Sequence, residues 1–158
     1  MVKKYFFLLA GILSGFLIIS AIKRKKSILF MGGLENSISL DNQVKKFKTF
    51  NDAPLIVHSH TQIKKLKNNI KNNPNSKVVL FSAGGKFANE IVDLVNNPNQ
   101  IFVIEPYTCG RNITNKIPKN NIFGGSNCET GNNVAGVFRS DYGGKSHSDS
   151  LIEIGKRL

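Results

Sequence analysis

Short apolar runs rich in Val, Ile, Leu and Phe recur along most of the chain, separated by polar segments that contain Gly, Pro and Asn. Such runs, bounded by turn-forming residues, are typical of buried β-strands. They occupy residues 27–31, 55–57, 78–81, 101–104, 122–123 and 134–138. Because nearly continuous apolar runs indicate strands that are covered on both faces, the pattern predicts a mostly parallel sheet.

The segments between these runs place apolar residues at helical spacing. The predicted helices cover residues 39–48, 61–72, 85–95 and 150–158. Strands that alternate with helices indicate the α/β class, in which helices flank both faces of the sheet. No repeat and no linker divides residues 27–158, so we expect one domain there with about five or six strands.

A sharp turn follows the third apolar run. Phe81 is followed at once by Ser82-Ala83-Gly84-Gly85, and helical spacing then begins. A serine at such a turn stands at the carboxyl end of a strand, and the amide of Ala83 points outward at the start of the helix. Together they supply a nucleophile and half of an oxyanion hole. An ordinary serine in a glycine-rich turn is the alternative interpretation.

The N-terminal part of the chain does not resemble a globular domain. Residues 5–22 carry no charge, with two lysines before them and the basic cluster at residues 23–26 after them. An apolar segment of this length can just cross a bilayer. The sequence therefore predicts a single-pass membrane anchor over residues 1–26, with a cleaved signal peptide as the alternative. The flanking charges leave the side of the membrane open.

The chain is strongly basic, with 22 Lys and Arg against 10 Asp and Glu and a net charge of +12. A basic surface beside an apolar segment suits anionic membrane lipids, which are the expected partners. Nucleic acid would also suit the charge, but the chain has no Trp and no recognisable nucleic-acid motif. We therefore do not expect nucleic acid as a partner.

Histidines and cysteines give no pattern of metal ligands. Cys109 and Cys128 have no metal-type spacing with the histidines, and two cysteines permit at most one disulfide bridge. His58 and His60 follow the second apolar run, where ligands bind in folds of this class. We expect them to line a substrate cleft, and we predict neither a metal nor a cofactor.

The turn at Ser82 resembles the nucleophile elbow of the α/β-hydrolases of the lipase and esterase type, whose pattern is G-x-S-x-G. Ser82 matches the nucleophile and Gly84 the downstream glycine, while Leu80 stands where the pattern has its upstream glycine. The resemblance covers about residues 27–158, without the leading strands or the lid of full-sized members.

This resemblance implies a complete catalytic site. The turn Gly32-Gly33-Leu34 would supply the second oxyanion amide, from Leu34, and Gly33 would contact the substrate. His147, in a loop before the last helix, matches the family's catalytic histidine. The third member would be a carboxylate, with Glu129 as the first choice and Glu105 and Asp141 as the alternatives.

The expected function is therefore that of a membrane-anchored serine hydrolase acting on a lipid or another small acyl ester. Ser82 would attack the acyl carbon, and neutral His147 would take and return the proton. The alternative is a catalytically inactive relative that keeps the fold and serves as a membrane-tethered binding protein.

Overall fold

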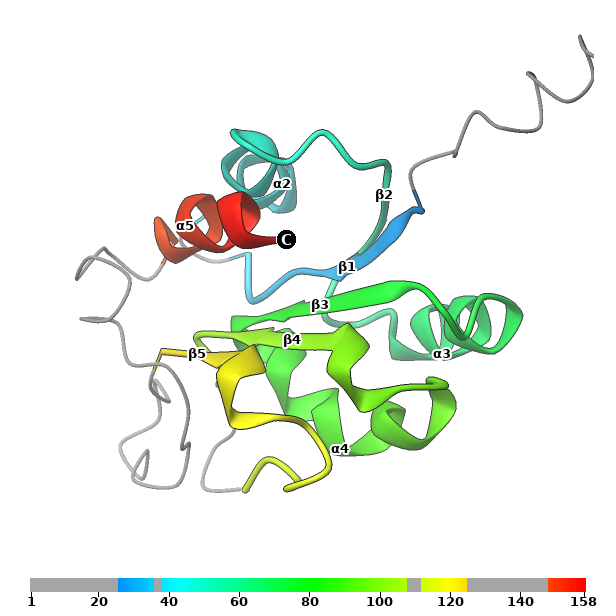
Figure 1. Cartoon of the computed structure of the whole chain (residues 1–158). Helices are drawn as coiled ribbons and strands as arrows, with labels where there is room; N and C mark the ends of the chain where they lie inside the picture. The colour runs from blue at the N-terminus through cyan, green and yellow to red at the C-terminus, as the bar shows by residue number, and fades with distance from the viewer. Residues whose placement is uncertain (1–25, 36–37, 108–111, 125–147) are drawn as a thin grey trace, which may run out of the picture.

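A five-stranded sheet forms the centre of the computed structural model, which describes residues 26–35, 38–107, 112–124 and 148–158 (Figure 1). The strands are β1 (Ile28–Met31), β2 (Leu55–His58), β3 (Lys77–Phe81), β4 (Ile101–Ile104) and β5 (Ile122–Phe123). Their order is β2-β1-β3-β4-β5, and every pair is parallel. The predicted α/β class with a parallel sheet is confirmed, while the strand predicted at 134–138 lies outside the described residues.

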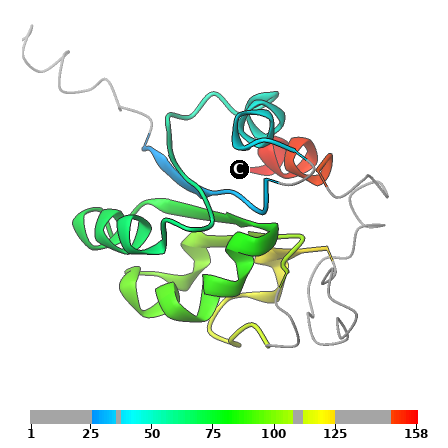
Figure 2. The same ribbon diagram turned by 180° about the vertical axis from the view of Figure 1, so that it is seen from behind.

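Helices cover both faces of the sheet. Helices α2 (Leu40–Lys48) and α5 (Ser150–Arg157) lie on one face, and α3 (Ile63–Asn72) and α4 (Ala88–Ile91) lie on the other (Figures 1 and 2). Short 3₁₀ turns η3 (Pro98–Gln100) and η4 (Lys119–Asn121) precede β4 and β5. The molecule therefore has three layers, in which the sheet lies between two layers of helices.

The alternation of side chains along each strand divides the core into two halves. Leu29, Met31, Val78 and Leu80 pack with α3 and α4, whereas Ile28, Phe30, Val79 and Phe81 pack with α2 and α5. Both sets are buried, which explains why the strand sequences show no polar alternation.

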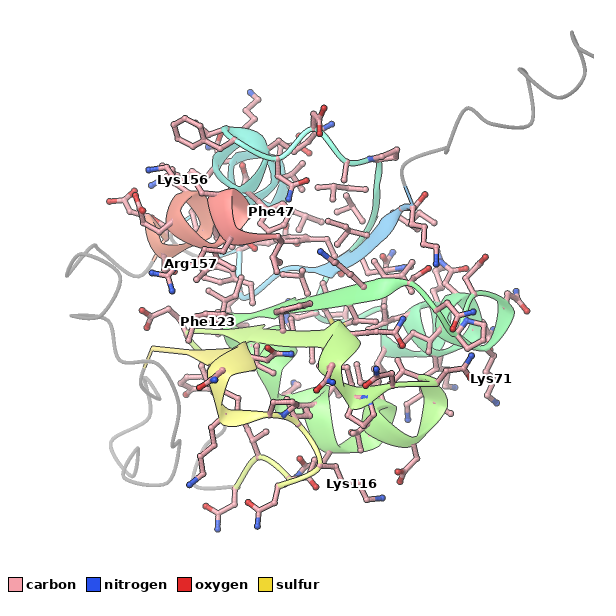
Figure 3. All side chains as sticks on the ribbon, viewed as in Figure 1. Phe47, Lys71, Lys116, Phe123, Lys156 and Arg157 are labelled. Atoms are coloured by element: carbon pink, nitrogen blue, oxygen red, sulfur yellow. The ribbon has the colours of Figure 1, made fainter. Side chains whose placement is uncertain are left out.

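Close packing holds α5 against α2. Gly155 of α5 lies so near the backbone of Phe47 that a Cβ atom there would stand 2.3 Å from the Phe47 carbonyl oxygen. The Lys46 ammonium donates to Ser148 Oγ at 2.9 Å and pairs with Asp149. Phe47, labelled in Figure 3, lies in the helical layer formed by α2 and α5. These contacts attach the C-terminal helix to the first half of the chain.

The segment after Ser82 differs from the single helix that was expected over residues 85–95. It begins as a 3₁₀ helix, η1 (Ser82–Phe87), and continues through α4 into a second 3₁₀ turn, η2 (Val92–Leu94). The prediction was wrong in start and regularity, because the segment begins at Ser82 and only Ala88–Ile91 within it is α-helical. A Cβ on Gly84 would also stand 3.0 Å from the Met31 carbonyl oxygen, so this turn is packed closely on β1.

The apolar segment at residues 5–22 lies outside the described residues. Among the residues that the structure describes, no helix is long and apolar enough to cross a membrane. The anchor therefore stays a prediction from the sequence.

Candidate functional site at the carboxyl edge of the sheet

The chain changes direction across the sheet between β1 and β3. From β1 it passes to α2 on one face, and from β3 it passes to α4 on the opposite face. Loops that diverge in this way open a crevice at the carboxyl ends of the two strands, which is where ligands bind in parallel α/β sheets. Gly33 follows β1 and Ser82 follows β3, so both sequence-predicted residues lie at this point.

Ser82 has an unusual backbone. Its φ angle is 51°, in the left-handed region, which costs a residue with a side chain about 1–2 kcal/mol. Its side chain lies directly against Gly33, because a Cβ on Gly33 would stand 2.5 Å from Ser82 Cβ and 3.0 Å from Oγ. Only glycine at position 33 leaves room for the serine, so the two turns form one structural unit.

The carbonyl and the hydroxyl of Ser82 differ in their hydrogen bonding. Its carbonyl accepts a hydrogen bond from the Tyr107 amide at 2.9 Å, which ties the turn to the segment after β4. Its hydroxyl has no hydrogen-bond partner among the described residues, although the residue is only 9% exposed. The amide of Ala83 lies in the first turn of η1, where amides have no acceptor within the helix.

A buried glutamine from α2 holds the turn after β1. Gln43 Oε1 accepts from the Gly33 amide at 2.9 Å, and Gln43 Nε2 donates to the Ile38 carbonyl at 3.0 Å. Within the described residues the next amide, that of Leu34, has no acceptor, and the Leu34 side chain is exposed. The sequence interpretation missed Gln43, although it lies on the apolar stripe of α2, three residues after Leu40, and this position was the available signal.

Replacement of Gln43 by methionine should lower the free energy of unfolding by about 2–4 kcal/mol. The change keeps the shape of the side chain but leaves the buried Gly33 amide without a partner, at about 1–3 kcal/mol, and the half-buried Ile38 carbonyl without its bond, at a smaller cost. Urea denaturation measures the loss, with exposed Asn42→Ala in the same helix as the control. Equal stabilities of the two variants would show that Gln43 does not hold the turn.

Leu80, which replaces the upstream glycine of the resembled pattern, is fully buried in the core half that α3 and α4 cover. It packs there with Ala88 and Ile91 from the segment that follows Ser82. The Leu80 side chain therefore fills core space that a glycine at position 80 would leave empty. The turn at Ser82 forms with this leucine present.

Glu105 is a fully buried carboxylate beside Ser82. The register pairs Phe81 with Ile104, so Ser82 and Glu105 stand at the same level just beyond adjacent strands. Glu105 also has a left-handed backbone, with φ of 47°, and its amide donates to the Phe123 carbonyl at 2.6 Å. Two neighbouring residues with side chains thus adopt a strained conformation at the same edge.

His58 and His60 lie at the carboxyl end of β2, separated from β3 by β1. His58 is buried, and its Nε2 lies 3.1 Å from the Asn69 amide nitrogen of α3. An amide nitrogen only donates, so this contact needs an unprotonated Nε2. Nδ1 of His60 is buried without a partner among the described residues. Nothing in the structure tests the predicted role of either residue in a substrate cleft.

The free energy of unfolding should fall as pH decreases below about 6.5, the usual pKa of histidine. Burial, and secondarily the charge of Lys65, lower the pKa of His58 in the folded protein. The unfolded chain therefore takes up the proton first, and the loss continues until pH falls below the lowered pKa. His58→Gln should flatten this part of the pH profile measured by urea denaturation. Profiles that stay parallel for the two proteins would contradict the assignment.

Comparison with protein-family models, with curated protein sequences and with solved structures gives no match. The function therefore has to be inferred from the chain's own residues.

Two predicted members of the site, His147 and Glu129, lie outside the described residues, as does Asp141. Among those that are described, no three His, Cys, Asp or Glu side chains lie together as metal ligands would. Three cavities lined by described residues, of about 420, 550 and 360 Å³, do not include Ser82. The structure thus brings together Ser82, Ala83, Gly33 and Leu34 and adds Gln43 and Glu105.

Proposed function

We propose that this chain is a membrane-anchored serine hydrolase that cleaves an acyl ester, with Ser82 as its nucleophile. The observation that carries the proposal is the left-handed backbone of Ser82 between β3 and η1, with its side chain against Gly33. Strain of this kind persists only where the surroundings enforce it, and it concentrates at functional sites. A nucleophilic serine needs this conformation to project from the end of a strand.

The reaction follows from the groups at this edge. Ser82 Oγ attacks the acyl carbon while His147 takes the hydroxyl proton, and the amides of Ala83 and Leu34 stabilise the negative oxygen that forms. His147 then gives its proton to the leaving alcohol, which departs and leaves an acyl-serine. Water, deprotonated by His147, attacks this ester, and the acid leaves as Ser82 regains its proton.

One observation supports His147 as the base. It stands three residues before α5, and α5 begins on the side of the sheet where the strands end (Figures 1 and 2). For the carboxylate, Glu105 is better supported than Glu129, because it is buried at the level of Ser82. A buried carboxylate orients the imidazole and stabilises its cation.

A fluorophosphonate probe tests the proposal without knowledge of the substrate, because it reacts with activated serines. The full chain in detergent should be labelled in its native state and unlabelled after denaturation. Mass spectrometry of the labelled peptide should place the adduct on Ser82. Absence of labelling of the well-folded protein would exclude an activated serine.

The second candidate is a membrane-tethered binding protein without catalysis. Leu80 in place of the upstream glycine favours it, and so does the position of the three cavities away from Ser82. The same probe distinguishes the two functions, since a binding protein needs no reactive serine.

A further inference from the structure

The amino ends of the strands form an edge opposite the candidate site, and lysine and asparagine side chains gather there. Lys26 lies two residues before β1, Lys77 begins β3, and Lys71 lies in the last turn of α3. The exposed Asn72 ends α3, and the exposed Asn73 and Asn75 lie in the connection between α3 and β3. Figure 3 shows Lys71 on the side of the molecule where β1 begins. We call these six residues the basic edge.

Two of the cavities open at the basic edge. One, of about 360 Å³, is lined by Lys26, Ile56 and residues 72–76, and the other, of about 550 Å³, by Lys26, Asn75 and Lys77 among others. Lys26 and Asn75 line both of them. This edge therefore offers hollows in which amide groups and ammonium groups face a ligand together.

The lysines of this edge are poorly neutralised. Within the described residues, Lys26 and Lys71 have no ion pair, and Lys77 donates to the Leu158 carbonyl. Asp52 is the acidic residue that lines the larger cavity. By contrast, lysines beside α4 are paired, as Lys67 is with Glu90 at 2.7 Å. The basic edge thus carries a positive charge that an external anion would neutralise.

The chain itself indicates which anion this is. The basic cluster at residues 23–26 and the apolar segment at residues 5–22 directly precede β1, so the predicted anchor joins the domain at the basic edge. We propose that the basic edge lies on the anionic phospholipid headgroups of the membrane that holds the anchor. Each lysine near such a surface strengthens the attachment about five-fold at physiological salt.

This placement bears on the substrate, a point that rests on the proposed function. The strands are about 13 Å long at a rise of about 3.3 Å per residue, so Ser82 and Gly33 stand at least that far above the basic edge. A lipid of the same membrane would have to leave the bilayer to reach them. We infer that the substrate is a soluble acyl ester that arrives from water.

Tryptophan fluorescence tests the placement, because the chain has no Trp of its own. Asn73→Trp puts a single reporter on the basic edge, where the Asn73 side chain is exposed, and Leu34→Trp puts one at the candidate site. Both are made in the full chain with Ser82→Ala, so the result does not depend on serine reactivity. The proteins are inserted into vesicles of brominated phosphatidylcholine, which quenches nearby Trp, with and without phosphatidylserine. Flotation of the protein together with the vesicles shows separately whether the protein has inserted.

With phosphatidylserine, emission of the Asn73→Trp protein should fall by about half or more, because attraction of the lysines to the anionic headgroups holds the reporter against the brominated lipid. Emission of the Leu34→Trp protein should stay unchanged. High salt should restore the first signal while the protein still floats, because an apolar anchor is not screened. Adding Lys71→Gln and Lys77→Gln should weaken the quenching, whereas Lys64→Gln with Lys65→Gln, the same loss of charge in the first turn of α3 at the opposite edge, should not.

Three outcomes would overturn the placement. Quenching of Leu34→Trp in place of Asn73→Trp would mean that the candidate site faces the membrane. No quenching of either reporter, whether or not the protein floats, would mean that the basic edge does not lie on the membrane. A response of Asn73→Trp to an RNA homopolymer and not to the vesicles would identify a nucleic-acid surface. Hydrolysis of vesicle phospholipid in preference to a soluble short-chain ester would contradict the inferred substrate class and leave the hydrolase proposal intact.

Discussion

Replacement of Ser82 by alanine is expected to abolish labelling by a fluorophosphonate and to reduce ester hydrolysis by about 10⁴- to 10⁶-fold, the effect of losing a nucleophilic serine. Alanine removes one oxygen atom and keeps the Cβ, so the backbone and the contact with Gly33 stay as they are. The free energy of unfolding should change little. His147→Ala should cause a similar loss of activity, and the double variant should lose no more, because the two residues act as a unit.

Two comparisons separate chemistry from structure in this experiment. Ser59→Ala removes a hydroxyl that is exposed and bonded to Thr61, at the end of β2, and it should leave labelling unchanged. Ser82→Gly should also be inactive, yet more stable than Ser82→Ala by about 1 kcal/mol, because glycine adopts a φ of 51° without strain. Continued labelling of Ser82→Ala would show that another residue reacts with the probe and would refute the proposed nucleophile.

Replacement of Leu80 by glycine is expected to lower the free energy of unfolding by about 4 kcal/mol or more. In the resembled pattern this change restores the upstream glycine. In this structure Leu80 is fully buried against α3 and α4. Removing such a leucine costs about 3–5 kcal/mol, and glycine in a strand adds about 0.5–1 kcal/mol.

Urea denaturation measures the loss, and Val57→Ala on the exposed side of β2 serves as the strand control, with an expected change below about 1 kcal/mol. Labelling of Leu80→Gly should decrease because a smaller fraction of the protein is folded. If the variant instead remained stable and was labelled faster than the natural protein, the leucine would be an obstruction at the turn and not a part of the core.

Local pattern was sufficient for the five strands that the structure describes and for the position of Ser82. Apolar runs such as Val78 to Phe81 are compatible with little other than a covered strand, and the glycines after Ser82 require the chain to turn there. The parallel arrangement followed because strands and helices alternate. The sheet order β2-β1-β3-β4-β5 was not predicted, although it is this order that brings Gly33 next to Ser82.

Features that depend on distant contacts were not predictable in the same way. Gln43 holds the turn after β1 only because α2 packs beside that turn. Glu105 ranked second among carboxylates in the sequence because its burial and its level beside Ser82 come from the pairing of β3 with β4. The break in the helix after Ser82 arises from packing on β1, which a helical spacing of apolar residues does not report.

The attachment of α5 to α2 has a consequence for how the protein is made. The ribosome releases β1 and α2 early, but the helix that packs on them follows more than a hundred residues later. Until α5 emerges, the apolar side chains of Phe47 and its neighbours on that face of the sheet stay partly open to water. A growing chain with such a surface is prone to aggregate and to engage chaperones. Synthesis of α5 therefore completes the half of the core that it shares with α2.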